Sequence, residues 1–393
     1  MGSRALALSS CIAAIAIAAC SSSKNASNGF VDAGGDATSG VDGGALDGNF
    51  PPPRDASLFE AGCATGTTRA IKDPIYVLMV LDGSGSMAND SKWKAIVPAL
   101  DLFIDELANR SDTSFGLGLT IFSDVNDATM GLGPYPKMDV PIAVVDSGQA
   151  LRLHQRLDTT APRQQTPTLA VLKGQNAALA SFAPSLPLRP GGKKALVLMT
   201  DGVPNPDPNT QKPLCVQAVA DAYALAAPEG PITTLAVGIG YFFPYAPLDY
   251  DQGFMGELAV AGGAPNQGCD PMNTWDSSMF CHFQVTPSGN DATELENEFL
   301  LAFDKIRSRL ASCELTLEKR DGGLPVEPGK VNVVFTDDHG YESVVPEDGM
   351  DGWTYDDPQN PSKVVLNGQA CAKLKANVHG KVDVVLGCKT IVP

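Results

Sequence analysis

The chain has 393 residues, which is long enough for two domains with hydrophobic cores of their own. It carries 45 acidic and 28 basic residues, for a formal net charge of -17 at pH 7. Proteins that bind nucleic acid need lysine and arginine to displace counterions from phosphates, so this charge argues against a nucleic-acid partner. Nine cysteines, with no C-x-x-C pair among them, indicate an oxidising compartment.

The first 20 residues have the pattern of a secretory signal, with Arg4 near the start and an apolar stretch before Cys20. That stretch is shorter than the roughly 20 apolar residues of a membrane-spanning helix. The ending Ile17-Ala18-Ala19-Cys20 resembles the bacterial lipobox. This resemblance implies cleavage before Cys20, lipidation of its thiol and, with Ser21 next, residence in the outer membrane. A plain signal peptide with an incidental cysteine is the alternative.

Residues 21–68 are rich in Ser, Gly, Ala and Asp, with three prolines at 51–53 and few large apolar side chains. Such a segment buries too little surface to offset its ordering entropy. We therefore expect a disordered tether of about 48 residues with an r.m.s. reach of roughly 40 Å.

An unbroken apolar run, Ile75–Leu81, stops abruptly at Asp82-Gly83-Ser84-Gly85-Ser86. Such a run is typical of a central strand buried on both faces of a parallel sheet, so its polar residues lie at the strand's carboxyl end, where open sheets bind ligands. A second apolar run, from Lys194, ends at Asp201-Gly202. Two carboxylates at one edge repel each other unless a divalent cation lies between them, and oxygen ligands suit Mg²⁺.

These two segments resemble the metal-ion-dependent adhesion site of the von Willebrand factor type A family, written D-x-S-x-S, then a distant Thr and a distant Asp. The matching residues are Asp82, Ser84, Ser86, Thr166 and Asp201. Thr168 is a rival for the threonine position. The resemblance extends over roughly residues 73 to 310.

The resemblance implies that Ser84 and Ser86 bind the cation directly and that Asp82 and Asp201 mainly hold coordinated waters. Thr166 binds directly or through water. The expected cation is Mg²⁺, with Mn²⁺ or Ca²⁺ as alternatives. Because Mg²⁺ keeps several waters, the site leaves a coordination position that a carboxylate from a partner protein can fill.

Strand-like and helix-like patterns alternate from residue 73 onward. Apolar residues at helical spacing predict helices over 93–107, 169–182, 216–227 and 295–310, and strands are expected over 114–123 and 232–240. This alternation predicts an α/β domain over 73–311, with a doubly wound, mainly parallel sheet and helices on both faces. Over 312–393, short β-prone runs between turns predict a small, disulfide-containing β-rich domain.

Two stretches interrupt this pattern. Residues 204–213 are too rich in proline for regular structure, and residues 262–287 contain two cysteines. We expect both to lie near the metal edge, as a rim that selects the partner or as variable loops without one.

Seven cysteines remain after the signal peptide and the lipidated cysteine are set aside, so one is left over. The expected pairs are Cys63 with Cys313, Cys269 with Cys281, and Cys371 with Cys388, leaving Cys215.

Enzymatic readings find no support in the sequence. The four histidines form no H-E-x-x-H motif, and Gly83-Ser84-Gly85-Ser86 is not a G-x-S-x-G nucleophile elbow. The sequence therefore predicts a non-enzymatic, exported, lipid-anchored protein that captures a protein ligand through Mg²⁺, in adhesion or surface assembly, with no small-molecule cofactor. The alternative is a structural envelope lipoprotein whose metal site captures no ligand.

Overall fold

The computed structural model describes residues 66–69, 71–110, 112–123, 135–227, 230–240, 251–285, 292–317, 327–337, 339–377, 380–386 and 389–390. The expected signal peptide with Cys20, nearly all of the expected tether, Cys63 and Cys388 lie outside these residues. Among the residues described, no helix is both long and apolar enough to cross a membrane.

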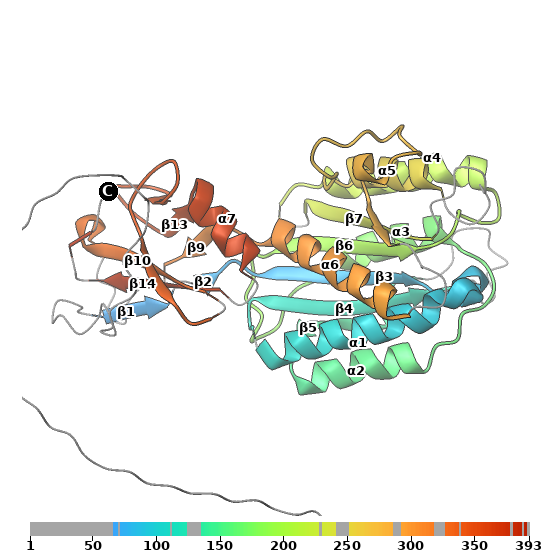
Figure 1. Ribbon diagram of the computed structural model, residues 1–393, viewed down its shortest axis with the longest axis horizontal. Coiled ribbons are helices and arrows are strands. Elements are labelled where there is room, and N and C mark those ends of the chain that lie inside the picture. The colour runs from blue at the N-terminus through green and yellow to red at the C-terminus, as the bar shows by residue number, and fades with distance from the viewer. Residues whose placement is uncertain are drawn as a thin grey trace, which may run out of the picture. The chain divides into compact units, whose positions relative to one another are not determined.

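A six-stranded sheet in the order β5-β4-β3-β6-β7-β8 forms the centre of the α/β part (Figure 1). Its strands are β3 (Ile75–Asp82), β4 (Phe115–Phe122), β5 (Val140–Val144), β6 (Lys193–Thr200), β7 (Ile232–Ile239) and β8 (Phe283–Val285). All neighbouring pairs are parallel except β4 with β5. Every residue of β3 is buried, which explains its unbroken apolar run.

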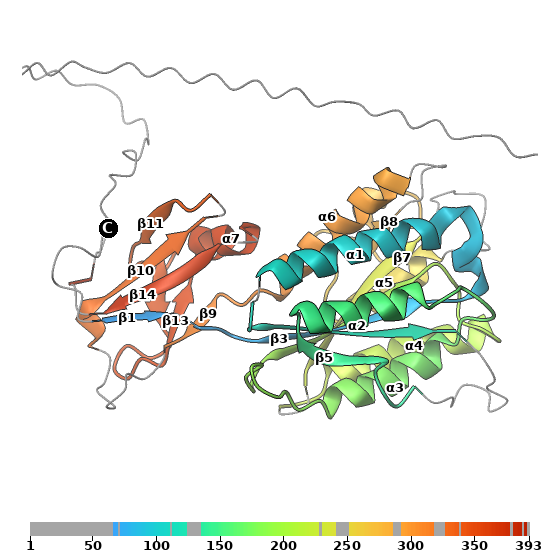
Figure 2. The same ribbon diagram turned by 90° about the horizontal axis from the view of Figure 1, so that it is seen from below.

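Helices cover both faces of this sheet. They are α1 (Lys92–Arg110), α2 (Ser147–Asp158), α3 (Thr168–Ala180), α4 (Pro208–Tyr223), α5 (Gln252–Ala261) and α6 (Ala292–Leu310), with short 3₁₀ turns at Gly85–Ser91 and Ser277–Met279. Apolar residues of α1, α2 and α6 share one core with the sheet, and those of α3, α4 and α5 share the other. Figure 2 shows α1 and α6 on one side of the sheet and α3 and α4 on the other. The predicted doubly wound, mainly parallel α/β fold is confirmed.

The prediction of irregular structure over 204–213 is wrong, because α4 begins at Pro208. The Asp207 side chain caps the helix by accepting from the backbone nitrogen of Thr210. A proline at the start of a helix costs no helical hydrogen bond, since the first N–H groups have no partner within the helix.

The segment 262–282 begins at the edge opposite the expected metal edge. It leads from the end of α5 to the start of β8, and Gly262 O accepts from the backbone nitrogen of Thr234, near the start of β7, at 2.9 Å. Residue 262 therefore lies at the edge where the parallel strands begin. Pro271 and Thr274 lie beside Gly256 and Gly253, so the segment then runs back along α5 toward the start of that helix.

The remaining strands form two antiparallel sheets, in the orders β1-β14-β10-β11 and β12-β13-β9-β2. They are β1 (Gly66–Arg69), β2 (Ile71–Lys72), β9 (Glu314–Thr316), β10 (Val331–Thr336), β11 (Glu342–Val345), β12 (Trp353–Tyr355), β13 (Lys363–Leu366) and β14 (Lys381–Leu386), with helix α7 (Gly368–Ala376) and a 3₁₀ turn at Pro328–Lys330. Apolar side chains of both sheets and of α7 form one core around the buried Trp353.

Two strands of these sheets come from before the α/β part. Strand β1 begins at Gly66, so the segment predicted as a tether does not extend to residue 68. It pairs with β14, and β2 pairs with β9. The C-terminal β structure is therefore completed by residues 66–72.

The disulfides confirm one predicted pair and contradict two. Cys269 and Cys281 are bonded, with Cα atoms 5.0 Å apart. Cys313 is bonded to Cys371, so the expected pairs Cys63–Cys313 and Cys371–Cys388 are wrong. The reason is the antiparallel pairing of β9 with β13, which brings Cys313 O within 2.8 Å of Leu366 N, just before the helix that carries Cys371.

Cys215, a buried residue of α4, is a free thiol, as predicted for the cysteine left over. Burial raises the pKa of this thiol to about 12, so it stays protonated and packs as an apolar side chain.

Candidate metal centre

The predicted site residues come together at the carboxyl edge of the sheet. Strands β3 and β6 pair in parallel with Leu81 opposite Met199, so Asp82 at the end of β3 lies near Asp201, which follows β6. Neither aspartate has any exposed surface. Two buried carboxylates that are 119 positions apart in the sequence therefore lie together at this edge of the sheet.

The loop before α3 packs against the turn after β3. Gly85 N donates to Gln164 O at 3.0 Å, and Arg163 N donates to Gly83 O at 2.8 Å. A Cβ atom added to Gly202 would lie 3.1 Å from Thr166 Oγ1 and 3.6 Å from Asp82 Oδ2. The Thr166 hydroxyl and the Asp82 carboxylate thus border the same small space beside Gly202.

Thr168, the alternative to Thr166 as the threonine ligand, lies in a different place. It is the first residue of α3, it is fully buried, and its hydroxyl lies 3.4 Å from the carbonyl oxygen of Thr166. Of the two threonines, Thr166 is the one that borders the space beside Gly202 and Asp82.

Hydrogen bonds link the two serines to the carboxylates. Ser86 Oγ donates to Asp201 Oδ1 at 2.7 Å, and Ser84 N donates to Asp82 Oδ1 at 2.8 Å. The Thr200 hydroxyl donates to the other oxygen of Asp82. The two serine hydroxyl oxygens lie 3.0 Å apart. Ser86 is partly exposed whereas Ser84 is buried, so solvent reaches the cluster from the Ser86 side.

Lys92 is the residue that sequence reasoning missed. This first residue of α1 is 1% exposed, and its Nζ lies 2.6 Å from Asp201 Oδ2. The signal was present in the helix pattern, because Lys92 lies four and eight positions before Ile96 and Leu100, on the apolar stripe of α1. A lysine on such a stripe needs a buried acidic partner.

Charge is only partly balanced in this cluster. Burial raises the pKa of Asp82 to about 7, and the nearby charge of Asp201 adds to that rise, while hydrogen bonds from Thr200 and Ser84 act against it. The two carboxylates and the Lys92 ammonium together carry a formal charge of -1 when all are ionised. A divalent cation at this place would offset both the burial of the carboxylates and their repulsion.

The donor set fits a hard cation with octahedral geometry. Two ligands about 2.1 Å from Mg²⁺ at a right angle stand roughly 3.0 Å apart, and the Ser84 and Ser86 oxygens have this separation. No three His, Cys, Asp or Glu side chains within the described ranges are placed to hold a metal. A metal at this edge would therefore depend on the hydroxyl oxygens as well as the carboxylates.

Comparisons with known proteins agree with the fold. Residues 77–243 match the family model of the von Willebrand factor type A domain, and no curated protein sequence matches the chain. The pilus adhesin SpaC from Lactobacillus rhamnosus GG is 13% identical with a TM-score of 0.43, and the match covers 82% of this chain but only 40% of the adhesin.

Two other solved structures are similar to a lower degree. Proximal thread matrix protein 1 from the mussel byssus is 15% identical with a TM-score of 0.38, covering 64% of this chain and 50% of that one. The vWF domain of the pilus tip protein Mfa5 from Porphyromonas gingivalis is 13% identical with a TM-score of 0.35, covering 60% and 97%. At these TM-scores, none of the three bears on function. The family match includes the whole carboxyl-edge cluster, and residues 77–243 of this chain form a von Willebrand factor type A domain.

Proposed function

We propose that this protein binds a divalent cation, foremost Mg²⁺, at the carboxyl edge of its sheet and uses it to capture a carboxylate of a protein ligand. The residues that would hold it are Asp82, Ser84, Ser86, Thr166 and Asp201. The observation that carries the proposal is the pair of hydroxyl oxygens 3.0 Å apart beside two fully buried carboxylates. When bound, the cation supplies a Lewis-acidic centre that attracts an anionic oxygen.

Each side chain has a part that follows from its contacts. The Ser86 hydroxyl donates a hydrogen bond to Asp201, and the backbone of Ser84 fixes the orientation of Asp82. Lys92 pairs with Asp201 Oδ2, which leaves the hydroxyl oxygens of Ser84 and Ser86 for the cation. The cluster carries a formal charge of -1, so a bound divalent cation would bring it to +1. A single carboxylate from a ligand would then neutralise the site.

We also propose where in the cell envelope the protein resides. The sequence favours export and lipid anchoring at Cys20, in the outer membrane, with a tether that lifts the folded part from the lipid surface. The two disulfides among the described residues fit an oxidising compartment. We therefore propose adhesion or surface assembly, without catalysis, as the use of the site.

A second candidate rests on the Lys92–Asp201 ion pair. Because the ammonium already lies 2.6 Å from Asp201, part of the buried charge is balanced within the chain itself. This internal charge balance favours the second candidate, a structural envelope lipoprotein that captures no ligand through a metal.

The test is calorimetric titration of the protein with Mg²⁺ and Mn²⁺. The informative variant is Ser84→Ala combined with Ser86→Ala, which removes two hydroxyls and no charge. Ser181→Ala is the matched control, because this exposed hydroxyl bonds only carbonyl groups of its own helix, α3. We expect saturable binding in the wild type and the control and none in the double variant. A folded wild-type protein that binds neither ion would refute the metal site.

A second titration tests ligand capture. The probes are the peptides Gly-Asp-Gly and Gly-Asn-Gly, both amidated, added to the protein in Mg²⁺ or in EDTA. We expect only the aspartate peptide to bind, and only in Mg²⁺. Cation binding without any response to the acidic peptide would favour the structural candidate.

A further inference from the structure

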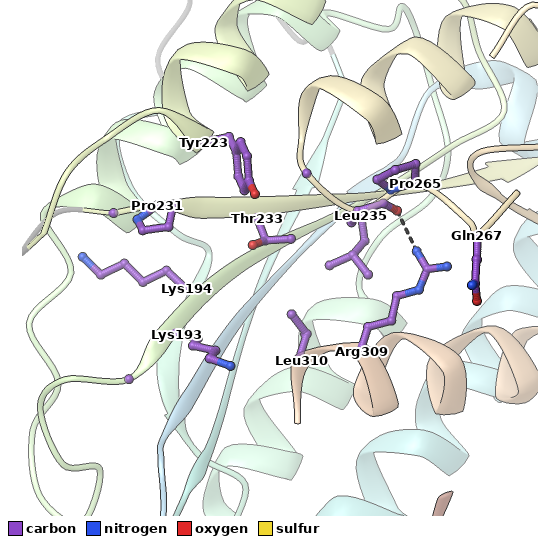
Figure 3. Close-up of a pocket in the computed structure, with 14 residues that line it drawn as sticks. Lys193, Lys194, Tyr223, Pro231, Thr233, Leu235, Pro265, Gln267, Arg309 and Leu310 are labelled. Carbon is purple, nitrogen blue, oxygen red and sulfur yellow. Dashed lines mark hydrogen bonds between the residues drawn. The ribbon is translucent and has the colours of Figure 1, made fainter. Parts of the chain in front are cut away.

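A cavity of about 740 Å³ lies at the amino-terminal edge of β6 and β7, at the end of the sheet opposite the candidate metal centre (Figure 3). Its walls come from the starts of both strands, from the ends of α4 and α6, and from the loop after α5. This volume is within the range of about 300–1,000 Å³ found for small-molecule sites. No step of the proposed metal chemistry uses it.

The charge of the lining is opposite to that of the chain. The fourteen described residues that line the cavity include Lys193, Lys194 and Arg309, and the other eleven are neutral. The whole chain has 45 acidic and 28 basic residues, so an average surface would bring carboxylates into such a lining. The cavity is therefore a local positive region on an acidic protein.

Arg309 shows that this region is short of negative charge. Its Nη1 donates to Ala264 O and its Nη2 to Asn266 Oδ1, both at 2.7 Å, and the guanidinium lies 4.9 Å from the centre of the Phe283 ring. All three partners are neutral. Burial lowers the pKa of this guanidinium, because its charge is partly removed from water.

Six other cations of the described structure are paired with carboxylates, whereas exposed ones such as Lys94 and Lys173 have no ion pair within the described ranges. Lys92, Arg110, Arg156, Lys212, Lys330 and Lys363 each lie within ion-pair distance of a carboxylate. Within the described ranges, neither Arg309 nor Lys193 has such a partner. The hydrogen bonds to Ala264 and Asn266 use two of the five N–H donors of Arg309, so further donors remain for a ligand.

The rest of the lining combines hydrogen-bonding and apolar groups. Figure 3 shows Tyr223 and Arg309 reaching toward the same space from the α4 and α6 sides, with Thr233 between them on β7. The exposed Pro231 and Pro265 and the ring of Tyr223 add apolar surface, whereas Leu235 and Leu310 are buried in the wall. A fully hydrated inorganic ion would leave that apolar surface unused.

We propose that this cavity binds a small organic oxyanion, a carboxylate or a phosphate carried on an apolar body. Arg309 and Lys193 bind the anionic group, and the prolines and the Tyr223 ring of the lining contact the body. The occupant supplies the negative charge that Arg309 lacks among its described neighbours.

The test compares four probes by calorimetry on the intact protein: phenylacetate, phenyl phosphate, the neutral phenylacetamide and inorganic phosphate. We expect one or both organic anions to bind at least tenfold more tightly than the amide and than inorganic phosphate. Preference between the two organic anions identifies the anionic group. Equal binding of the amide, or no binding of either organic anion, would overturn the proposal.

Variants locate the site. Arg309→Gln should weaken binding of the preferred anion tenfold or more, because charge-assisted hydrogen bonds are lost. Lys193→Gln, at an exposed position that leaves the core untouched, should weaken it several-fold. Arg156→Gln is the matched control, since Arg156 pairs with Asp139 away from the cavity. Wild-type affinity in both the Arg309 and Lys193 variants would refute the assignment.

Discussion

The substitution Lys92→Met removes a buried ammonium and keeps a side chain of similar length. Its Nζ lies 2.6 Å from Asp201 Oδ2, and both Asp82 and Asp201 have no exposed surface. Removing one partner of a buried ion pair costs about 3–5 kcal/mol, because the other charge stays buried without compensation. Here the remaining charges are two carboxylates of like sign, so we expect a loss near the upper end of this range at pH 8.

The loss should depend on pH and on Mg²⁺. Without Lys92, the carboxylates can relieve their repulsion by taking up a proton, so the loss should be smaller at pH 5.5 than at pH 8. The variant's cluster carries a formal charge of -2 instead of -1, so Mg²⁺ should bind it more tightly than it binds the wild type. Mg²⁺ at 100 times its Kd would return about 2.7 kcal/mol.

Urea unfolding of the variant and the wild type in EDTA and in MgCl₂ measures these differences. Lys94→Met is the matched control, because this neighbouring lysine is exposed. Adding Asp201→Asn to Lys92→Met removes both charges of the pair and should recover part of the stability. If Lys92→Met is as stable in EDTA as Lys94→Met, the ion pair contributes nothing and the reasoning is refuted.

Three further predictions concern pH and the disulfide. Because the pKa of Asp82 is raised to about 7, Mg²⁺ must displace a proton below that pH, so calorimetry should show the affinity falling up to tenfold per pH unit between 7 and 5.5; a constant affinity would contradict this. Burial lowers the pKa of His154, but its contacts with two α1 aspartates outweigh this and raise it. The stabilisation is then fully present below the unfolded pKa of 6.5 and is lost as pH rises through the folded value; His154→Gln should cost under about 1 kcal/mol at pH 6 and nothing at pH 9 in thermal unfolding. Replacing Cys313 and Cys371 by alanine opens a loop of 58 residues and should destabilise the C-terminal sheets by about 4 kcal/mol, seen as faster proteolysis after residue 312; unchanged proteolysis would show that the bond adds little.

Local patterns predicted the centre of the fold well. The apolar run Ile75–Leu81 is long enough to identify a strand with both faces buried, and a parallel strand must end at the same edge as its neighbours. This argument alone predicted that Asp82 and Asp201 lie close together. The pair Cys269–Cys281 was also predictable, since only 12 positions separate the two cysteines.

Contacts between distant segments were not predictable in this way. Strand β2 has two residues, too few for a periodic pattern, and its pairing with β9 joins segments more than 240 positions apart. The bond between Cys313 and Cys371 follows from the pairing of β9 with β13, for which the sequence contains no local signal. The direction of α5 decides that residue 262 lies at the amino-terminal edge, and this depends on counting every crossover before it.

The position of Lys92 bears on how the candidate site would work. Two buried carboxylates with no counter-charge would make folding depend on the metal, as in small domains that unfold when chelated. In this protein the ammonium beside Asp201 supplies one positive charge from the chain itself. The domain can then remain folded without metal, and the cation would control ligand capture instead of folding. On this reasoning, EDTA should abolish binding of an acidic ligand while lowering the unfolding temperature only slightly. A site balanced by Lys92 that captures no ligand would show the same small fall in unfolding temperature, but no acidic ligand would bind in Mg²⁺ or in EDTA.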